Sequence, residues 1–329
     1  MKQRQSNTEL LRILAIFCVL MGHGCWMVLG MPSSKDISEH FTLEFSRLLI
    51  GGLTIGSVNV FVLISGWFGI HPSAKGLGKF LYQIAFLLWG IYIVFLLTGN
   101  AAFSLSDIQP SMGIYDGYWF IMAYLGMYIL SPILNAFTEK ASKKQFELTL
   151  AALFIFQCYY CWGWSMVNYF SGYSLVFFCF LYLLARYVRI YPISIINNHY
   201  LAIYFVSSIA ISLIACIGIW LIGSPMKMLR YDNPLTILSA LGLLVTFSKI
   251  KITSKFINQL AKSCFAVYII HFNPFIFPYF KKGATIIANN YNGLLYALII
   301  FCYLIVVYLG CSAVDRLRLL TWSMITKKA

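Results

Sequence analysis

The sequence has few charged residues and very few acidic ones. Charged side chains make up 10% of its 329 residues, with only 10 Asp and Glu, whereas hydrophobic residues make up 60%. Soluble globular proteins contain about 25% charged and about 45–50% apolar residues, so this composition argues against a soluble enzyme. On a soluble domain the net charge of +14 would suggest nucleic acid, but in so apolar a chain it bears on orientation in a bilayer. We predict a polytopic protein surrounded by membrane lipid, with no nucleic-acid partner.

The chain also lacks internal repeats, low-complexity stretches and a separate soluble domain. The longest expected loops lie at about 30–47 and 99–117, so residues 1–329 are predicted to form a single integral membrane domain. The nine cysteines are odd in number and lie almost entirely within apolar runs, which implies no disulfide framework. Cys158 and Cys161 are interpreted as packing residues, and no metal site is expected.

Ten apolar windows are long enough, or nearly so, to cross a hydrocarbon core, which takes about 20 helical residues. They cover residues 10–29, 48–70, 80–97, 118–137, 148–164, 170–190, 201–222, 234–247, 263–280 and 294–314. The fifth and eighth are short, so nine or eleven spans remain open. The predicted fold is an all-α transmembrane helical bundle. Glu9 and Arg12 interrupt the start of the first window, which favours a retained span over a cleaved signal peptide.

The distribution of Lys and Arg tests this count, because cytoplasmic loops carry an excess of both. With the N-terminus inside, the outer loops hold only Lys35, Arg47, Lys227, Arg230, Lys281 and Lys282, and the rest of the 24 cations lie on the inner side. A wrong number of spans would scramble this asymmetry. Both termini are therefore predicted to be cytoplasmic.

Two histidines, His23 and His271, lie deep within predicted spans, where ionisable groups are costly and by default suggest function. Arg12 and His23 are eleven residues apart, which places them on one helix face with a rise of about 16 Å. An arginine on the same helix face favours a functional role for His23, since neutral imidazole is a common general base near pH 7. For His271 alone, a structural role is equally well supported. Lys75 and Lys79 could contact phosphate or simply set the topology beside lipid headgroups.

Four motifs in order resemble the acyltransferase-3 family of integral membrane acyltransferases, whose usual architecture has ten spans. They are Arg12 and His23 behind Glu9-Leu-Leu, the segment from Gly56 to Phe68, the segment from Tyr118 to Tyr124 closing with Leu130-Ser131-Pro132, and the segment from Ser263 to His271. Members often carry arginines after the second span, where this chain has lysines at 75 and 79. Lysine keeps the charge but lacks the planar, two-pronged donor.

The resemblance implies transfer of an acetyl group from cytoplasmic acetyl-CoA to a hydroxyl of a cell-surface carbohydrate or its lipid-linked precursor. It implies a bacterial cytoplasmic (inner) membrane protein with acetyl-CoA as co-substrate and no permanently bound cofactor. It leaves open a homodimer or an association with proteins of polysaccharide assembly. Many members append an extracytoplasmic domain that this sequence does not show.

The same resemblance implies roles for individual residues. His23 would deprotonate the acceptor or briefly carry the acetyl group. Ser65, Tyr268 and His271 are candidates for stabilising the oxyanion or relaying protons. The donor site comprises Arg12, Lys75, Lys79 and Ser65, and the acceptor site comprises Glu9, Asn59, Trp119 and Tyr124. An interfacial aromatic belt would explain Trp119 and Tyr124 equally well.

Two other functions fit the same features. A transporter or flippase for a lipid-linked saccharide or small solute would share the span count and buried histidines, but inverted repeats would favour it and none is found. A non-catalytic small-molecule sensor is the weaker alternative.

Overall fold

A computed structural model of the chain describes residues 5–114, 116–165 and 170–327, which form helices joined by short connections, with no strand among them. The first half contains α1 (Ser6–Met21), η1 (Gly22–Trp26), α2 (Met27–Leu29), α3 (Ser34–Thr54), α4 (Ser57–Phe68), α5 (Ala74–Leu97), η2 (Leu105–Asp107), α6 (Ile108–Ser111), η3 (Asp116–Tyr118), α7 (Trp119–Lys140), α8 (Lys143–Phe156) and η4 (Gln157–Gly163). The second half contains η5 (Phe170–Gly172), α9 (Leu175–Ile190), α10 (Ser194–Asn198), α11 (Tyr200–Ile222), α12 (Pro234–Lys249), α13 (Lys255–Leu260), η6 (Ala261–Ser263), α14 (Cys264–His271), α15 (Phe277–Asn290) and α16 (Gly293–Lys327).

Six helical segments are long and apolar enough to cross a membrane, which confirms the all-helical membrane fold. They are Ser6–Leu29, Ser34–Phe68, Ala74–Leu97, Trp119–Lys140, Tyr200–Ile222 and Gly293–Thr326, and Pro234–Lys249 is a shorter apolar helix. The predicted window 263–280 is broken between α14 and α15. There Pro274 has no N–H to continue a helix, and the side chain of Asn273 accepts a hydrogen bond from the backbone of Phe275. The count of ten spans stays a prediction.

One predicted loop, 30–47, is largely helical. Helix α3 begins after Ser33, whose hydroxyl accepts from the Asp36 backbone while the Asp36 carboxylate accepts from the Ser33 backbone. This reciprocal cap starts the helix well before its apolar part. The prediction of a loop was wrong because polar residues such as Lys35 and Glu39 lower the hydropathy of the first turns. The other predicted loop, 99–117, contains only the short η2, α6 and η3.

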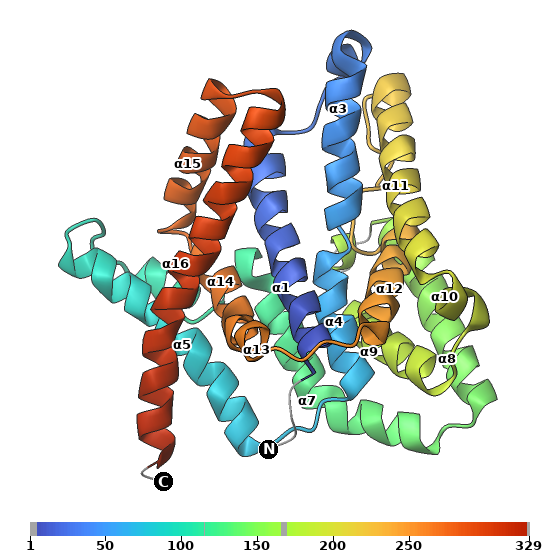
Figure 1. Cartoon of the computed structure of the whole chain (residues 1–329). Helices are drawn as coiled ribbons and strands as arrows, with labels where there is room; N and C mark the ends of the chain where they lie inside the picture. The colour runs from blue at the N-terminus through green and yellow to red at the C-terminus, as the bar shows by residue number, and fades with distance from the viewer. Residues whose placement is uncertain (1–4, 115, 166–169, 328–329) are drawn as a thin grey trace.

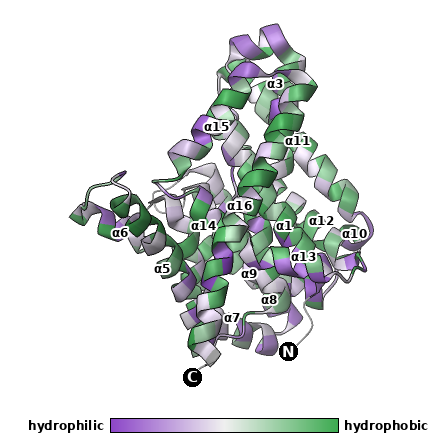
Figure 2. Cartoon of the chain, turned by 60° about the vertical axis from the view of Figure 1, so that its left-hand side comes forward, coloured by the Kyte–Doolittle hydropathy of each residue, from purple (hydrophilic) through white to green (hydrophobic). Residues whose placement is uncertain are grey.

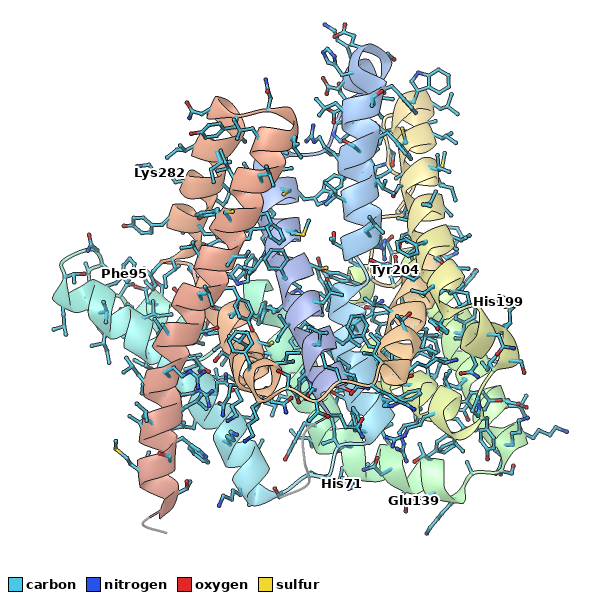
Figure 3. All side chains as sticks on the ribbon, in the orientation of Figure 1. His71, Phe95, Glu139, His199, Tyr204 and Lys282 are labelled. Carbon is cyan, nitrogen blue, oxygen red and sulfur yellow. The ribbon has the colours of Figure 1, made fainter. Side chains whose placement is uncertain are left out.

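The start of α1 and the end of α16 lie at the same, lower end of the molecule, while α3, α11 and α15 reach the upper end (Figure 1). His71 and Glu139 also lie at the lower end, and Lys282 lies near the upper end (Figure 3). The ribbons of α11 and α16 carry many residues in the hydrophobic colour (Figure 2). Exposed apolar side chains such as Leu221 and Val306 are suited to contact with lipid.

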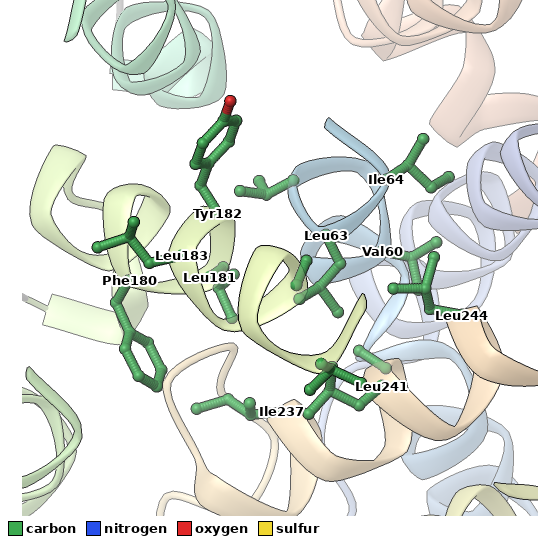
Figure 4. Close-up of a cluster of buried hydrophobic side chains, with 14 of the residues drawn as sticks. Val60, Leu63, Ile64, Phe180, Leu181, Tyr182, Leu183, Ile237, Leu241 and Leu244 are labelled. Atoms are coloured by element: carbon green, nitrogen blue, oxygen red, sulfur yellow. The ribbon is translucent and has the colours of Figure 1, made fainter. Parts of the chain in front are cut away.

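Helix α4 lies at the centre of the packed interior. Val60 and Leu63 of α4 pack with Leu181 of α9 and with Leu241 and Leu244 of α12 (Figure 4). A second apolar cluster includes residues of α14 and α16. Helix α1 contributes side chains to both clusters and lies between them. Consequently α1, which carries both Arg12 and His23, is held between two apolar clusters and cannot shift independently of them.

Candidate active site

His23 lies in a widened turn of the first span. Helix α1 ends at Met21, and residues 22–26 form the π-helical turn η1 before α2 completes the segment. Such turns are rare and are found frequently at functional sites. At Gly24, an added Cβ atom would lie 3.2 Å from the Leu304 side chain, so a glycine lets α16 approach closely. The sequence gives no signal for the π-helical turn beyond the two glycines beside His23.

The imidazoles of His23 and His271 are hydrogen-bonded to each other. The Nδ1 atom of His23 is 2.8 Å from Nε2 of His271, and Nδ1 of His271 is 2.5 Å from the carbonyl oxygen of Val267. A carbonyl only accepts, so a neutral His271 carries its proton on Nδ1 and presents a lone pair at Nε2. His23 must then donate from Nδ1, which leaves a lone pair on its Nε2 atom. The arrangement selects the tautomer that a general base requires.

Three adjoining cavities run along α1. The inner chamber, of about 310 Å³, is lined by Glu9, Arg12, Phe61, Ser65, Phe80, Gln83, Phe120, Tyr124, Ala261, Lys262, Cys264 and Phe265. The central chamber, of about 250 Å³, shares Phe61, Phe120, Cys264 and Phe265 with it and adds His23, Trp119, Tyr173, Tyr231 and Tyr268 among others. The outer chamber, of about 230 Å³, shares His23, Val19, Met27, Val58 and Tyr231 with the central one and reaches Trp26 and Met31. His23 lines both the central and the outer chamber.

The inner chamber is lined by the charged side chains Glu9, Arg12 and Lys262, which line neither of the other two chambers. Arg12 donates to the Glu9 carboxylate over 2.6 Å, and its side chain remains 32% exposed. Ser65 donates to the Phe61 carbonyl over 3.1 Å and lies 3.1 Å from the Tyr124 hydroxyl. Because the Ser65 proton is engaged, Tyr124 donates to Ser65. These four predicted residues are therefore brought together around one cavity.

The central chamber is mainly aromatic. The ring of Trp119 stacks on Tyr173 with a centroid distance of 4.2 Å, and Tyr231 lies 5.6 Å from Trp119. Tyr268 lines the chamber, but its hydroxyl donates to the carbonyl of Gly117 over 3.1 Å. Stabilising an oxyanion with this hydroxyl would first require breaking that bond. Trp119 and Tyr268 thus both line the same chamber as His23.

A clamp of polar side chains holds Tyr231 in the loop before α12. Asn59 donates to the Tyr231 carbonyl over 2.9 Å. Arg230 and Asp232 flank Tyr231 in the sequence. Arg230 donates two hydrogen bonds to the Asp232 carboxylate, at 2.9 and 2.5 Å. It also donates to the Ser165 hydroxyl and to the Cys161 carbonyl. Burial raises the pKa of the Tyr231 phenol, so the hydroxyl stays protonated.

Some predicted residues do not line the three chambers. His271 is fully buried behind His23, and Asn59 is buried behind Tyr231. Lys75 and Lys79 are exposed at the start of α5, and their part in binding the acyl donor stays a prediction. In the described part of the chain, no group of three or more His, Cys, Asp or Glu residues could hold a metal ion.

Sequence reasoning missed several residues of these chambers, among them Gln83, Tyr173, Tyr231 and Lys262. Lys262 was counted only among the cations of the inner side, and Gln83, Tyr173 and Tyr231 belong to none of the four motifs. A signal existed for Tyr231, because Arg230 and Asp232 flank it in a chain with only 10 acidic residues. For Gln83, a neutral amide inside an apolar window was the available signal.

The comparison with protein families agrees with the site. The sequence model of the acyltransferase-3 family, described as an acyltransferase domain, matches residues 6–316, nearly the whole chain. The chain belongs to the acyltransferase-3 family. Its membership makes the protein a membrane acyltransferase in general terms. Neither the curated proteins nor the solved structures include a match.

Proposed function

We propose that the protein transfers an acetyl group from acetyl-CoA to a hydroxyl of a cell-surface carbohydrate or its lipid-linked precursor. The observation that carries this proposal is His23, whose free Nε2 is set by His271 and which lies above a polar chamber containing Arg12. Membership of the family supports acyl transfer as the reaction. The geometry of the chambers supports acetyl-CoA as the donor and a carbohydrate as the acceptor.

The donor fits the inner and central chambers in length and in chemistry. Coenzyme A carries phosphates at one end and the thioester at the other, joined by the pantetheine arm. Arg12 and Lys262 provide positive charge at the inner chamber, suited to phosphate. His23 lies eleven positions after Arg12 along one helical segment, a rise of about 16 Å that an extended pantetheine arm can bridge.

The proposed orientation follows from charge. Lys140, Lys143 and Lys144 cluster between α7 and α8, next to Glu139 at the lower end. The excess of such cations on cytoplasmic loops favours a cytoplasmic lower end, where acetyl-CoA is available. We further propose ten crossings of a bacterial cytoplasmic membrane. The six long segments and α12 would supply seven of them. Helix α9, the pair α8–η4 and the pair α14–α15 would supply the other three.

The chemistry requires one general base. Nε2 of His23 takes the proton of the acceptor hydroxyl while the hydroxyl oxygen attacks the thioester carbonyl carbon. The tetrahedral intermediate then collapses, the C–S bond breaks, and the thiolate of coenzyme A takes the proton back from Nε2. The ester and free coenzyme A are the products, and His23 is regenerated. Acetyl label found on His23 without acceptor would instead identify a covalent intermediate.

The aromatic walls suit a carbohydrate. Trp119, Tyr173 and Tyr231 line the central chamber together with His23, and the two tyrosines add hydroxyl groups to the aromatic rings. The outer chamber is lined largely by apolar side chains such as Trp26, Met27 and Ile55, which suits the hydrocarbon part of a lipid-linked acceptor. Since His23 lines both chambers, donor and acceptor can reach it from different directions.

The test uses membranes containing wild-type protein or His23→Ala, incubated with acetyl-labelled acetyl-CoA. We expect alkali-labile label in the envelope fraction of the wild type and none with His23→Ala. His199→Ala is the matched control, because His199 is exposed at the start of α11 (Figure 3). If the wild type transferred no label and did not bind acetyl-CoA, the donor assignment would fall and a transporter would become the leading alternative.

A further inference from the structure

Gln83 of α5 has unused hydrogen-bonding capacity in the inner chamber. The residue is 8% exposed and lines the chamber, and its buried side-chain amide nitrogen has no hydrogen-bond partner. Leaving such a donor unpaired in the interior costs stability, so native structures rarely retain one without a reason. A ligand that supplies the missing acceptor is such a reason.

The other polar side chains of the chamber each make at least one hydrogen bond. Arg12 donates to Glu9, Tyr124 and Ser65 are joined to each other, and Lys262 donates to Gln259 over 2.9 Å. None of these hydrogen bonds involves Gln83. In the described chamber wall, the side-chain amide nitrogen of Gln83 is a buried donor without a partner, and a neutral acceptor on a ligand would satisfy it.

We propose that Gln83 binds the pantetheine arm of the acyl-CoA donor by donating its amide N–H to an amide carbonyl of that arm. This inference rests on the proposed function, because it takes the donor to be a coenzyme A thioester. The chamber that Gln83 lines extends from the cationic side chain of Arg12 to the residues it shares with the His23 chamber. The part of the donor between the phosphates and the thioester is the part that contains two amides. A side-chain amide matches that chemistry, since it can donate to one carbonyl and accept from an N–H.

The test compares two donors in the purified protein with a fixed acceptor preparation. Acetyl-CoA and acetyl-pantetheine share the arm and the thioester but differ in the nucleotide and its phosphates. For Gln83→Leu we expect KM to rise about fivefold to tenfold for both donors, as for one lost hydrogen bond, with kcat little changed. Gln83→Met, which is also apolar and has an unbranched chain, should behave alike and keeps the test available if the leucine variant folds poorly.

Gln157 provides a matched control. It is fully buried in η4, and both of its side-chain polar atoms lack a hydrogen-bond partner, but it lines none of the three chambers. Gln157→Leu should leave KM for both donors within twofold of wild type. Without ligand, Gln83→Leu and Gln157→Leu should each melt at or above the wild-type temperature, because each removes an unpaired buried amide.

The outcomes separate this inference from the proposed function. An active wild type with unchanged donor KM in Gln83→Leu and Gln83→Met would overturn the inference alone. A rise in KM for acetyl-CoA but not for acetyl-pantetheine would also overturn it, since Gln83 would then contact the nucleotide. A wild type that transfers acetyl from neither thioester would overturn the proposed function, and the role of Gln83 with it.

Discussion

The imidazole of His271 determines which nitrogen of His23 is free. Nε2 of His271 lies 2.8 Å from Nδ1 of His23, and its other nitrogen faces the Val267 carbonyl, so the pair has one consistent pattern of donors and acceptors when both rings are neutral. His271 is fully buried and lines none of the chambers. In the proposed mechanism His271 is therefore a positioning residue, which orients the base His23 without touching the substrate.

Replacing His271 should impair turnover and leave donor binding intact. His271→Leu cannot accept from Nδ1 of His23, so the imidazole would lose both its orientation and its tautomer, and kcat should fall at least about 100-fold. His271→Gln keeps an acceptor oxygen and should recover part of that loss. The measurement is kcat and donor KM for both variants. Equal losses in the two, with a lowered melting temperature, would show that His271 acts through packing alone.

Replacing Arg12 should weaken binding of acetyl-CoA and spare acetyl-pantetheine, because the proposed contact is with phosphate. We expect Arg12→Ala to raise KM for acetyl-CoA about tenfold or more, with a smaller rise in Arg12→Lys, which keeps the charge but not the two-pronged geometry. Lys75→Ala and Lys79→Ala should have smaller effects, since both side chains lie in the exposed start of α5. An unchanged KM for acetyl-CoA in Arg12→Ala would remove Arg12 from the donor site.

Much of this architecture could be predicted from local sequence. Apolar runs locate helices because the bilayer requires about 20 apolar residues, and each of the ten windows contains helix in the structure. The placement of Arg12 below His23 follows from the pitch of one helix. Both predictions depend on short-range geometry, in which neighbouring residues on the chain determine the outcome.

What could not be predicted depends on packing between distant segments. His23 and His271 are 248 residues apart, and nothing in either neighbourhood specifies that their rings meet. The same holds for Asn59, whose side chain donates to the carbonyl of Tyr231, 172 residues away, and whose contact with the acceptor stays a prediction. The start of α3 was missed for another reason, because its cap and polar first turns oppose the hydropathy signal.

Gly66 of α4 lies against the backbone of α9 and should not tolerate a side chain. A Cβ atom there would lie 2.3 Å from the carbonyl oxygen of Tyr182, and backbone cannot move aside as a flexible side chain would. Gly66→Ala should therefore lower the melting temperature strongly or prevent folding. Gly90→Ala in α5 is the matched control, because its added Cβ meets no atom within 4 Å and alanine is the better helix former by about 1 kcal/mol. Comparable stability of the two variants would contradict the close packing of α4 on α9.

The ion pair between Arg230 and Asp232 should support both stability and the acceptor site. Only 8% of the Arg230 side chain and none of the Asp232 side chain is exposed, so removing one partner leaves a buried charge unpaired. We expect Arg230→Met to cost about 3–5 kcal/mol, and the double variant Arg230→Met/Asp232→Leu to recover part of it. Thermal unfolding of the purified variants measures this coupling.

The same pair holds Tyr231 from both sides, which gives a functional readout. The double variant should raise KM for the acceptor, because Tyr231 forms part of the wall beside His23, while donor KM stays within twofold of wild type. Tyr231→Phe provides the comparison, since it keeps the ring and loses only the hydroxyl. A smaller acceptor effect in Tyr231→Phe than in the double variant would assign recognition to the placement of the ring. A rise in donor KM instead would place the donor, and not the carbohydrate, against Tyr231.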